Sequence, residues 1–280
     1  MNLNLDRLFL ADGAMGTQLL QKGFAGCLES LVLTEPQIIQ DIHRQYAAVG
    51  AQILLTHTFG ANRLALNAKG FGGSVEEINT KAVMLIKSVA SEFAKPLQIF
   101  GSVGPTQLSR DDIQTLDFNI LRAVFREQAQ TLVEAGVQGL VLETFYNAKE
   151  LCMALEATQD LAVPVVSSVT LTLQGQLLDG TTLPELVAIW QHYNPTLVGL
   201  NCSDTPTLLW PVWQALQSQI QKPFWLKLNA GMPGQMLTPE EFAVQCRPYI
   251  KSNLAVIGGC CGTTALHLQA LQRDINKIPS

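Results

Sequence analysis

Short apolar runs alternate with longer amphipathic segments along the whole chain, and the alternation occurs eight times. The short runs are rich in leucine and β-branched residues and have the length of strands, whereas the segments between them repeat their apolar residues at helical spacing. The predicted strands are Leu8–Ala11, Gln52–Thr56, Leu97–Val103, Gly139–Glu143, Val165–Leu171, Thr196–Asn201, Phe224–Asn229 and Leu254–Gly258. Near-continuous apolar strands joined by helices are typical of a parallel sheet covered on both faces.

The intervening segments carry the start and stop signals of helices. The clearest predicted helices are Pro36–Val49, Phe118–Ala135, Asn147–Leu161 and Pro239–Ile250. A glycine follows each of the first two, and the capping residue Thr238 precedes the last. Eight strand–helix units favour a closed (β/α)8 barrel, the TIM barrel, over the alternative of an open doubly wound sheet.

No stretch of the chain has the composition of a linker. The only glycine-dense segment, Gly70–Gly73, lies between two helical patterns and is predicted to be a surface loop. Residues 1–280 are therefore predicted to form one α/β domain, a single barrel.

Composition excludes several kinds of protein. The chain has 280 residues, of which 48% are hydrophobic and 15% charged, and the charged fraction is too low for long disordered tails. Its 18 Lys and Arg against 23 Asp and Glu leave no basic excess, so nucleic acid is not an expected partner. Met1–Asp12 lacks the features of a signal peptide and no window is apolar enough to span a membrane, which predicts a cytoplasmic protein without membrane contact.

Polar residues and cysteines gather where the predicted strands end. They are Asp12, Thr56, Ser102, Glu143, Asn201, Cys202, Asn229, Cys260 and Cys261. In a barrel all of these ends lie on the C-terminal rim, where the loops after the strands build the active site. The pattern therefore predicts two carboxylates and three thiols around one opening.

The three cysteines on this rim predict a metal site. Cys202 is 58 residues before Cys260, but their strands are separated by only one strand of the ring, so their ends lie about 10 Å apart. Three thiolates without histidine favour Zn²⁺, and three protein ligands leave a fourth position open, as in catalytic zinc sites. Two alternatives remain open: the thiols are small buried apolar groups, or Gly258–Gly262 cradles a phosphate.

The other cysteines and histidines give weaker signals. Cys27, Cys152 and Cys246 have no partner at ligand spacing and are predicted to be structural. Three histidines lie in predicted helices: His43, expected to face outward or an interface, His192 and His267. Only His57 follows a strand on the catalytic rim.

Asp12 and Glu143 are the two carboxylates of the rim. A turn of small residues, Gly13–Thr17, follows Asp12, and its backbone N–H groups can bind a carboxylate. The alternative is that Asp12 only caps the next helix. Glu143 ends an apolar strand, where burial is costly without a partner. A substrate ammonium group supplies such a partner, and hydrogen bonds from neighbouring backbone are the alternative.

Six segments together resemble the homocysteine S-methyltransferase family. They are DGAMGT at 12–17, THTFGAN at 56–62, GSVGPT at 101–106, ETF at 143–145, GLNCS at 199–203 and GGCCGT at 258–263. The resemblance covers nearly the whole chain in the correct order. The motifs THTFGANRL and GSVGPT most resemble those of the homocysteine-binding barrel of cobalamin-dependent methionine synthase.

The resemblance implies a (β/α)8 barrel whose Zn²⁺ is held by Cys202, Cys260 and Cys261. It also implies that Asp12 and Glu143 hold the amino group of homocysteine, while backbone near Gly13–Thr17 or Ser102–Gly104 receives its carboxylate. The predicted substrate-binding residues are Asp12, Gly13, Ala14, Thr56, Ser102, Glu143 and Asn201, with no catalytic residue beyond the metal site. This chain departs from the family at His57, where methionine synthases more often have Asn, and at Thr144, where betaine-dependent members have Tyr.

The predicted function is a zinc-dependent homocysteine S-methyltransferase that makes methionine. A free thiol has a pKa near 8.5, and coordination to Zn²⁺ keeps the homocysteine sulfur as a thiolate that attacks an activated methyl group. The methyl donor stays open between an S-methylmethionine-type sulfonium compound and a methyl-corrinoid protein. No segment resembles a corrinoid or folate domain, so an alternative is a homocysteine-activating module that works only with a separate carrier protein. A methyltransferase acting on another thiol, or on a xenobiotic, is a further alternative.

Overall fold

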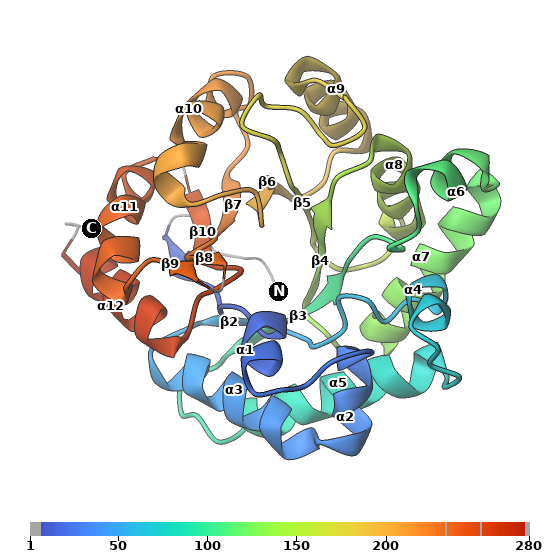
Figure 1. The fold of residues 1–280 in the computed structure, drawn as a ribbon, viewed down its shortest axis with the longest axis horizontal. Coiled ribbons are helices and arrows are strands. Elements are labelled where there is room, and N and C mark those ends of the chain that lie inside the picture. The colour runs from blue at the N-terminus through green and yellow to red at the C-terminus, as the bar shows by residue number, and fades with distance from the viewer. Residues whose placement is uncertain (1–6, 233, 253, 278–280) are drawn as a thin grey trace.

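Eight parallel strands surround a common axis in the computed structural model, which describes residues 7–232, 234–252 and 254–277 (Figure 1). Their order is β1-β10-β7-β6-β5-β4-β3-β2, and a bridge between Ala11 and Ile53 joins the first strand to the last. The predicted (β/α)8 barrel is therefore confirmed, and the open doubly wound sheet is wrong. The strands are β1 Phe9–Leu10, β2 Ile53–Leu55, β3 Gln98–Val103, β4 Gly139–Phe145, β5 Val165–Val169, β6 Leu197–Asn201, β7 Phe224–Leu228 and β10 Leu254–Gly259.

Helices surround the barrel and follow the strands (Figure 1). They are α1 Gly16–Gln21, η1 Leu28–Ser30, α2 Leu31–Thr34, α3 Pro36–Ala48, α4 Arg63–Ala68, α5 Val75–Ala90, α6 Arg110–Thr115, α7 Phe118–Glu134, α8 Ala148–Thr158, α9 Leu183–Tyr193, α10 Pro206–Gln217, α11 Pro239–Ile250 and α12 Ala265–Ile275. Most predicted boundaries hold to within a few residues. One correction matters for the site: Glu143 lies inside β4 rather than at its end.

Local sequence explains where the longer helices begin and end. Thr238 accepts a hydrogen bond from Glu241 N and completes a capping box at the start of α11, as its sequence predicts. Gly136 has a φ of +91°, a left-handed conformation that favours glycine, directly after the end of α7.

The apolar core has two parts because barrel strands have two faces. Inside the barrel, Phe100 and Trp225 stack with ring centroids 6.0 Å apart and pack with apolar residues from the other strands. Outside the barrel, a larger cluster fills the space between strands and helices. Side chains two residues apart in a strand share a face. A residue two positions after one of the inner apolar layer therefore also points into the barrel, nearer its C-terminal end. Lys227 follows Trp225 in this way, and Glu143 follows Val141.

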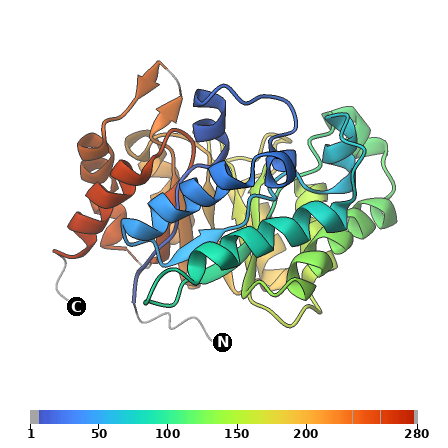
Figure 2. The same cartoon turned by 90° about the horizontal axis from the view of Figure 1, so that it is seen from below.

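Additional elements rise over the C-terminal end of the barrel. They are α1 and a hairpin formed by β8 Gly231–Met232 and β9 Gln235–Met236, which project on the same side of the barrel in Figure 2. The hairpin was not predicted from the sequence. Among the described residues, no helix has both the length and the apolar character to cross a membrane. The segment Met1–Asp12, which was predicted not to be a signal peptide, lies outside the described residues at positions 1–6.

Candidate active site

The three cysteines of the rim lie together at the ends of β6 and β10. Their Sγ atoms are all within 4.8 Å of one another, and those of Cys202 and Cys261 are 3.3 Å apart. All three side chains are half-buried. The predicted convergence of the thiols is thus present, and whether they hold a metal stays a prediction.

The backbone around the cysteines is constrained. Cys202 has a φ of +55°, a left-handed conformation that costs free energy for a residue with a side chain. Cys260 N donates to Leu228 O at 2.7 Å, and Ala230 N donates to Cys261 O at 2.8 Å. Hydrogen bonds from the neighbouring thiols of Cys202 and Cys260 hold the pKa of Cys261 well below its usual value.

Most backbone N–H groups of the glycine-rich segment Gly258–Gly262 bond within the protein. Gly259 N donates to Asp12 O, Gly262 N donates to Thr17 Oγ1, and Thr263 N donates to Cys260 O. Together with the bond of Cys260 N, these contacts occupy most of the N–H groups that a phosphate would need. They argue against the alternative of a phosphate site at Gly258–Gly262.

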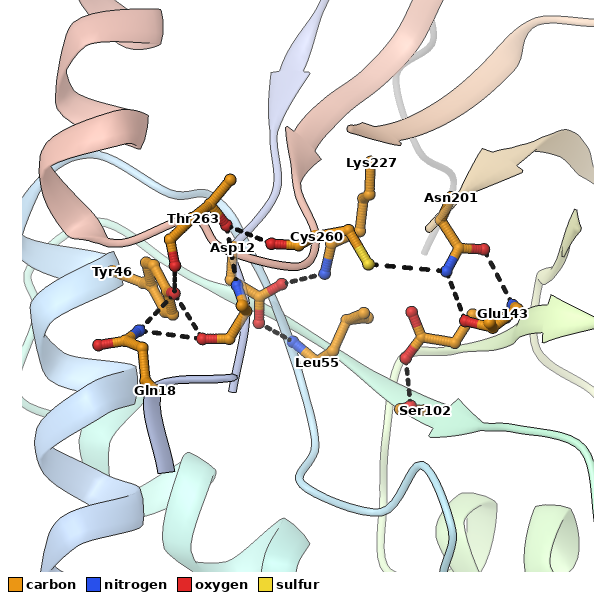
Figure 3. Close-up of polar contacts among 12 residues, drawn as sticks. Asp12, Gln18, Tyr46, Leu55, Ser102, Glu143, Asn201, Lys227, Cys260 and Thr263 are labelled. Atoms are coloured by element: carbon orange, nitrogen blue, oxygen red, sulfur yellow. Dashed lines mark hydrogen bonds and ion pairs between the residues drawn. The ribbon is translucent and has the colours of Figure 1, made fainter. Parts of the chain in front are cut away.

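Asp12 is paired inside the protein with a lysine that the sequence analysis missed. Its Oδ1 lies 2.6 Å from Nζ of Lys227 on β7, and its Oδ2 accepts a hydrogen bond from Leu55 N at 2.8 Å (Figure 3). The side chains of Asp12 and Lys227 are only 5% and 4% exposed. Burial alone lowers the pKa of Lys227, but the carboxylates of Asp12 and Glu143 more than offset this and hold it above its usual value.

The signal for Lys227 was present in the sequence. The predicted strand Phe224–Asn229 reads FWLKLN, and one cation inside an otherwise apolar strand is costly to bury without a carboxylate. The carboxylate belongs to Asp12, 215 residues away, and only barrel closure brings the two together.

Glu143 lies across the opening from Asp12 and has a different environment. Its Oε1 accepts a short hydrogen bond from Ser102 Oγ (Figure 3), and no ion pair holds its carboxylate among the residues that the structure describes. Burial raises the pKa of Glu143 to about 7, because the positive charge of Lys227 only partly compensates for lost hydration. Near neutral pH, Glu143 is therefore about half protonated, and a cation bound beside it would favour the ionised form.

Asn201 connects the two sides of the site. Its Oδ1 accepts from Thr144 N at 2.9 Å and from Ser168 Oγ at 2.7 Å, and its Nδ2 donates to Thr144 Oγ1 at 2.6 Å and lies 3.9 Å from Cys260 Sγ. These contacts hold Thr144, whose φ is +63°, directly after Glu143. The structure thus shows Asn201 bound to other parts of the protein, and its predicted contact with substrate stays a prediction.

The remaining predicted substrate-binding residues lie in two hydrogen-bonded groups. Thr56 Oγ1 contacts Thr58 Oγ1 at 2.6 Å and accepts from Ser102 N at 3.0 Å, which fixes the strand that carries Ser102. On the other side, Ala14 N donates to Thr263 Oγ1 at 3.1 Å, so this N–H of the predicted carboxylate-binding turn is already used.

Gly13 marks a close approach in the same turn. A Cβ atom at this position would lie 2.7 Å from the ring of Tyr46 and 2.8 Å from Thr263 Oγ1. Glycine therefore lets the chain after Asp12 pack against Tyr46, whose hydroxyl donates to Ala14 O at 2.6 Å. The turn is held by the protein itself, and a substrate contact of Gly13 and Ala14 stays a prediction.

The histidines and outlying cysteines have other surroundings. His57 Nε2 lies 2.8 Å from Leu28 O and ties the end of the strand to the first residue of η1. His43 is 1% exposed, and neither ring nitrogen has a partner among the described residues, so its predicted outward or interfacial position is wrong. Burial lowers the pKa of His43 to about 3 and keeps the ring neutral. Cys27, Cys152 and Cys246 are free thiols outside the cluster.

The thiols and carboxylates lie at the C-terminal ends of the barrel strands, which is where (β/α)8 enzymes have their active sites. Similarity to known proteins identifies the family. The model of the family described as homocysteine S-methyltransferase matches residues 9–275. The chain belongs to this family, which confirms the resemblance found in the sequence motifs.

Named relatives agree with this family. Methionine synthase from Mycobacterium leprae is 27% identical over 97% of the chain, but the chain spans only 24% of that protein. The metallated form of the homocysteine methyltransferase MmuM from Escherichia coli is 25% identical, has a TM-score of 0.80, and the match covers 96% of this chain and 97% of that one. The oxidized form of MmuM, at 24% identity and a TM-score of 0.84 over 98% and 99% of the two chains, shares the fold. The chain thus spans about a quarter of the curated methionine synthase it matches.

Proposed function

We propose that this protein is a zinc-dependent homocysteine S-methyltransferase that forms methionine, with Zn²⁺ bound by Cys202, Cys260 and Cys261. The observation that carries the proposal is the convergence of three sulfur atoms within 4.8 Å on the catalytic rim. The relative described as metallated supports a metal in this fold.

The donor set fits the proposed metal. Tetrahedral zinc with bonds of about 2.3 Å to sulfur separates its ligand sulfurs by ~3.8 Å. The Sγ atoms of Cys202 and Cys261 are 3.3 Å apart, slightly closer than this value. All three Sγ–Sγ distances are at most 4.8 Å, so the set brackets the spacing that zinc requires. Three thiolates would leave one position of a tetrahedral Zn²⁺ for a substrate sulfur, and the ion would lower the pKa of that thiol so that it is ionised at neutral pH.

The side chains of the opening orient the rest of the amino acid substrate. We place its ammonium group at the carboxylates of Asp12 and Glu143, because the Asp12 charge is paired with Lys227 while that of Glu143 has no ion pair among the described residues. Ser102 fixes one oxygen of Glu143, and Thr56 fixes the backbone of Ser102. The pocket thereby positions the sulfur of homocysteine toward the cysteine cluster.

The chemical step is a displacement at carbon. The substrate sulfur attacks the methyl carbon of the donor, a new sulfur–carbon bond forms, and the bond from methyl to its carrier breaks with its electron pair leaving on the carrier. No proton moves in this step, because Zn²⁺ held by the three cysteines would keep the substrate sulfur as a thiolate, its proton having gone to solvent. This explains why the site needs no general base.

Replacement of a cluster cysteine tests the proposal. In Cys260→Ser we expect loss of bound zinc, measured by elemental analysis, and loss of methyl transfer to homocysteine. Cys152→Ser is the matched control, since Cys152 is a free thiol on α8 outside the cluster, and it should keep both properties. Full activity of Cys260→Ser without zinc would contradict the proposal.

The methyl donor divides the proposal into two forms. Similarity to the homocysteine methyltransferase MmuM agrees with direct transfer from a small donor such as an S-methylmethionine-type sulfonium compound. Similarity to methionine synthase agrees with a homocysteine-activating module that receives methyl from a corrinoid protein. Turnover of S-methylmethionine by the purified chain supports the first form. Turnover only after addition of a methyl-corrinoid protein supports the second, and activity with other thiols but not homocysteine contradicts both.

A further inference from the structure

The strand β4 has one residue more than its neighbour β5 at the level of the active site. Leu142 is paired with Ser167 and Phe145 with Val169, so three steps along β4 match two along β5. Such a bulge changes the face on which the following side chains lie. Leu142 and Phe145 accordingly both pack in the outer apolar cluster, although residues three apart in a regular strand lie on opposite faces. Without the bulge, Phe145 would follow Glu143 into the mouth of the barrel.

Thr144 lies in the bulge and has a conformation that threonine rarely adopts. Its φ is +63°, in the left-handed region, where a β-branched residue is an outlier. Glycine is the residue that usually takes a left-handed position in a bulge. A threonine there costs free energy, so its conformation needs support from the surrounding structure.

Asn201, the last residue of β6, supplies this support. Its Oδ1 accepts from Thr144 N at 2.9 Å and its Nδ2 donates to Thr144 Oγ1 at 2.6 Å, so one amide holds both the backbone and the side chain of Thr144. Oδ1 also accepts from Ser168 Oγ at 2.7 Å. Nδ2 also lies 3.9 Å from Cys260 Sγ, and Figure 3 shows Asn201 between Cys260 and Glu143.

These contacts use the whole hydrogen-bonding capacity of the amide. A primary amide has two donor hydrogens and an oxygen with two acceptor positions, and all four have a partner within the protein. The side chain is also buried, with only 1% of Asn201 exposed. A direct contact between Asn201 and a substrate would therefore require one of these bonds to break.

The bulge determines what β4 contributes to the opening of the barrel. Glu143 directly precedes Thr144 and accepts a hydrogen bond from Ser102 Oγ, so it is held at its carboxyl group and through its backbone. Phe145 packs outside the barrel against Phe125 of α7, with ring centroids 5.6 Å apart. Glu143 is thus the last side chain of β4 that points into the opening.

We propose that Asn201 is a positioning residue that holds Thr144 in its left-handed conformation and thereby sets the place of Glu143 in the homocysteine pocket. The inference rests on the proposed function and deepens it, since Asn201 acts on substrate only through the bulge of β4. Glycine adopts the left-handed conformation without the cost that threonine pays. The need for Asn201 should therefore disappear when glycine replaces Thr144, whereas a residue that contacts substrate directly would be needed in either case.

A double-mutant cycle between positions 201 and 144 separates these two roles. The affinity of the zinc-loaded protein for L-homocysteine is measured by calorimetry for the wild type, Asn201→Ala, Thr144→Gly and the double variant. We expect Asn201→Ala to weaken binding by roughly 10-fold or more, as for the loss of hydrogen bonds to a buried group. In the Thr144→Gly background the same change should weaken binding by less than about threefold.

The controls address folding, metal content and the general effect of glycine. Asn194→Gly is the matched control, because Asn194 is also a left-handed residue, with a φ of +51°, but lies at the C-terminal end of α9. It should not restore the affinity of Asn201→Ala. Elemental analysis checks zinc, since Cys202 directly follows Asn201, and circular dichroism melting checks the fold. Asn201→Ser replaces Asn201→Ala in the cycle should the latter fail to fold.

The outcomes separate this inference from the proposed function. Equal losses of affinity in the two backgrounds, or an unchanged affinity in Asn201→Ala, overturn the role given to Asn201 while homocysteine stands as the substrate. Loss of zinc in both Asn201 variants that Thr144→Gly does not restore overturns it as well. Failure of the zinc-loaded wild type to bind homocysteine overturns the proposed function, and this inference with it.

Discussion

The pKa of Glu143 predicts a change in stability with pH that is large enough to measure. Burial raises this pKa from 4.5 to about 7 in the folded protein, whereas in the unfolded chain the side chain is hydrated and keeps its ordinary value. The folded state therefore binds more protons than the unfolded state between these two values. Its stability must fall as pH rises through this window, because ionisation is disfavoured only in the folded state.

The magnitude follows from linkage. With pKa values of 4.5 unfolded and about 7 folded, ionisation of Glu143 costs about 0.8 kcal/mol at pH 5 and about 3.3 kcal/mol at pH 8. Glu143→Gln removes this cost and keeps an acceptor for the hydroxyl of Ser102. Relative to wild type, the variant should gain about 2.5 kcal/mol in free energy of unfolding between pH 5 and pH 8.

Urea unfolding of the metal-free, reduced proteins at both pH values is the measurement, since bound zinc would add its own pH dependence. Glu127→Gln is the control: Glu127 lies on the outside of α7, 41% exposed, where such a change moves stability by roughly 0.5 kcal/mol or less. A difference between Glu143→Gln and wild type that stays constant from pH 5 to pH 8 would refute the burial of an unpaired carboxyl group.

Three further changes test other parts of the structure. In Gly199→Ala the new Cβ would lie 1.7 Å from the carbonyl oxygen of Trp225, so β6 and β7 must separate, and we expect a loss of ~3 kcal/mol or failure to fold, read from thermal melting. Tyr46→Phe deletes the hydroxyl that donates to Ala14 O at 2.6 Å and should lower the free energy of unfolding by about 1–3 kcal/mol; an unchanged urea midpoint would show that this bond contributes nothing. Chelation of zinc should lower the melting temperature, because metal present at 100 times its Kd stabilises the folded state by about 2.7 kcal/mol, and Cys261→Ser should show no such response to chelator.

The barrel and the cysteine cluster were predictable from sequence because both depend on short-range patterns. Alternation of apolar strands with amphipathic helices determines the order of elements, and a parallel barrel places every strand end on one rim. Cys202, Cys260 and Cys261 follow directly after two of those strands, so their convergence follows from strand order alone. The boundaries of β4 and the hairpin β8–β9 were less predictable, since local propensity leaves strand ends and short turns open.

His43 shows where a local pattern was available but misread. It occupies the same face of α3 as Ile39, Ile42 and Tyr46, at the spacing of a buried helical stripe. Its polar ring argued for the surface, but the packing of α3 against the barrel buries that face regardless of one histidine.

The sequence by itself determined the fold, the family and the position of the thiols, because these follow from periodicity and from residues adjacent to strand ends. Only the tertiary structure decided how the charges are paired. Lys227 meets Asp12 across 215 residues because the closed barrel turns both side chains inward, and Glu143 is left without a cation by the same geometry. Pairing and desolvation depend on distances between chain-distant atoms, and no local pattern of residues encodes those distances.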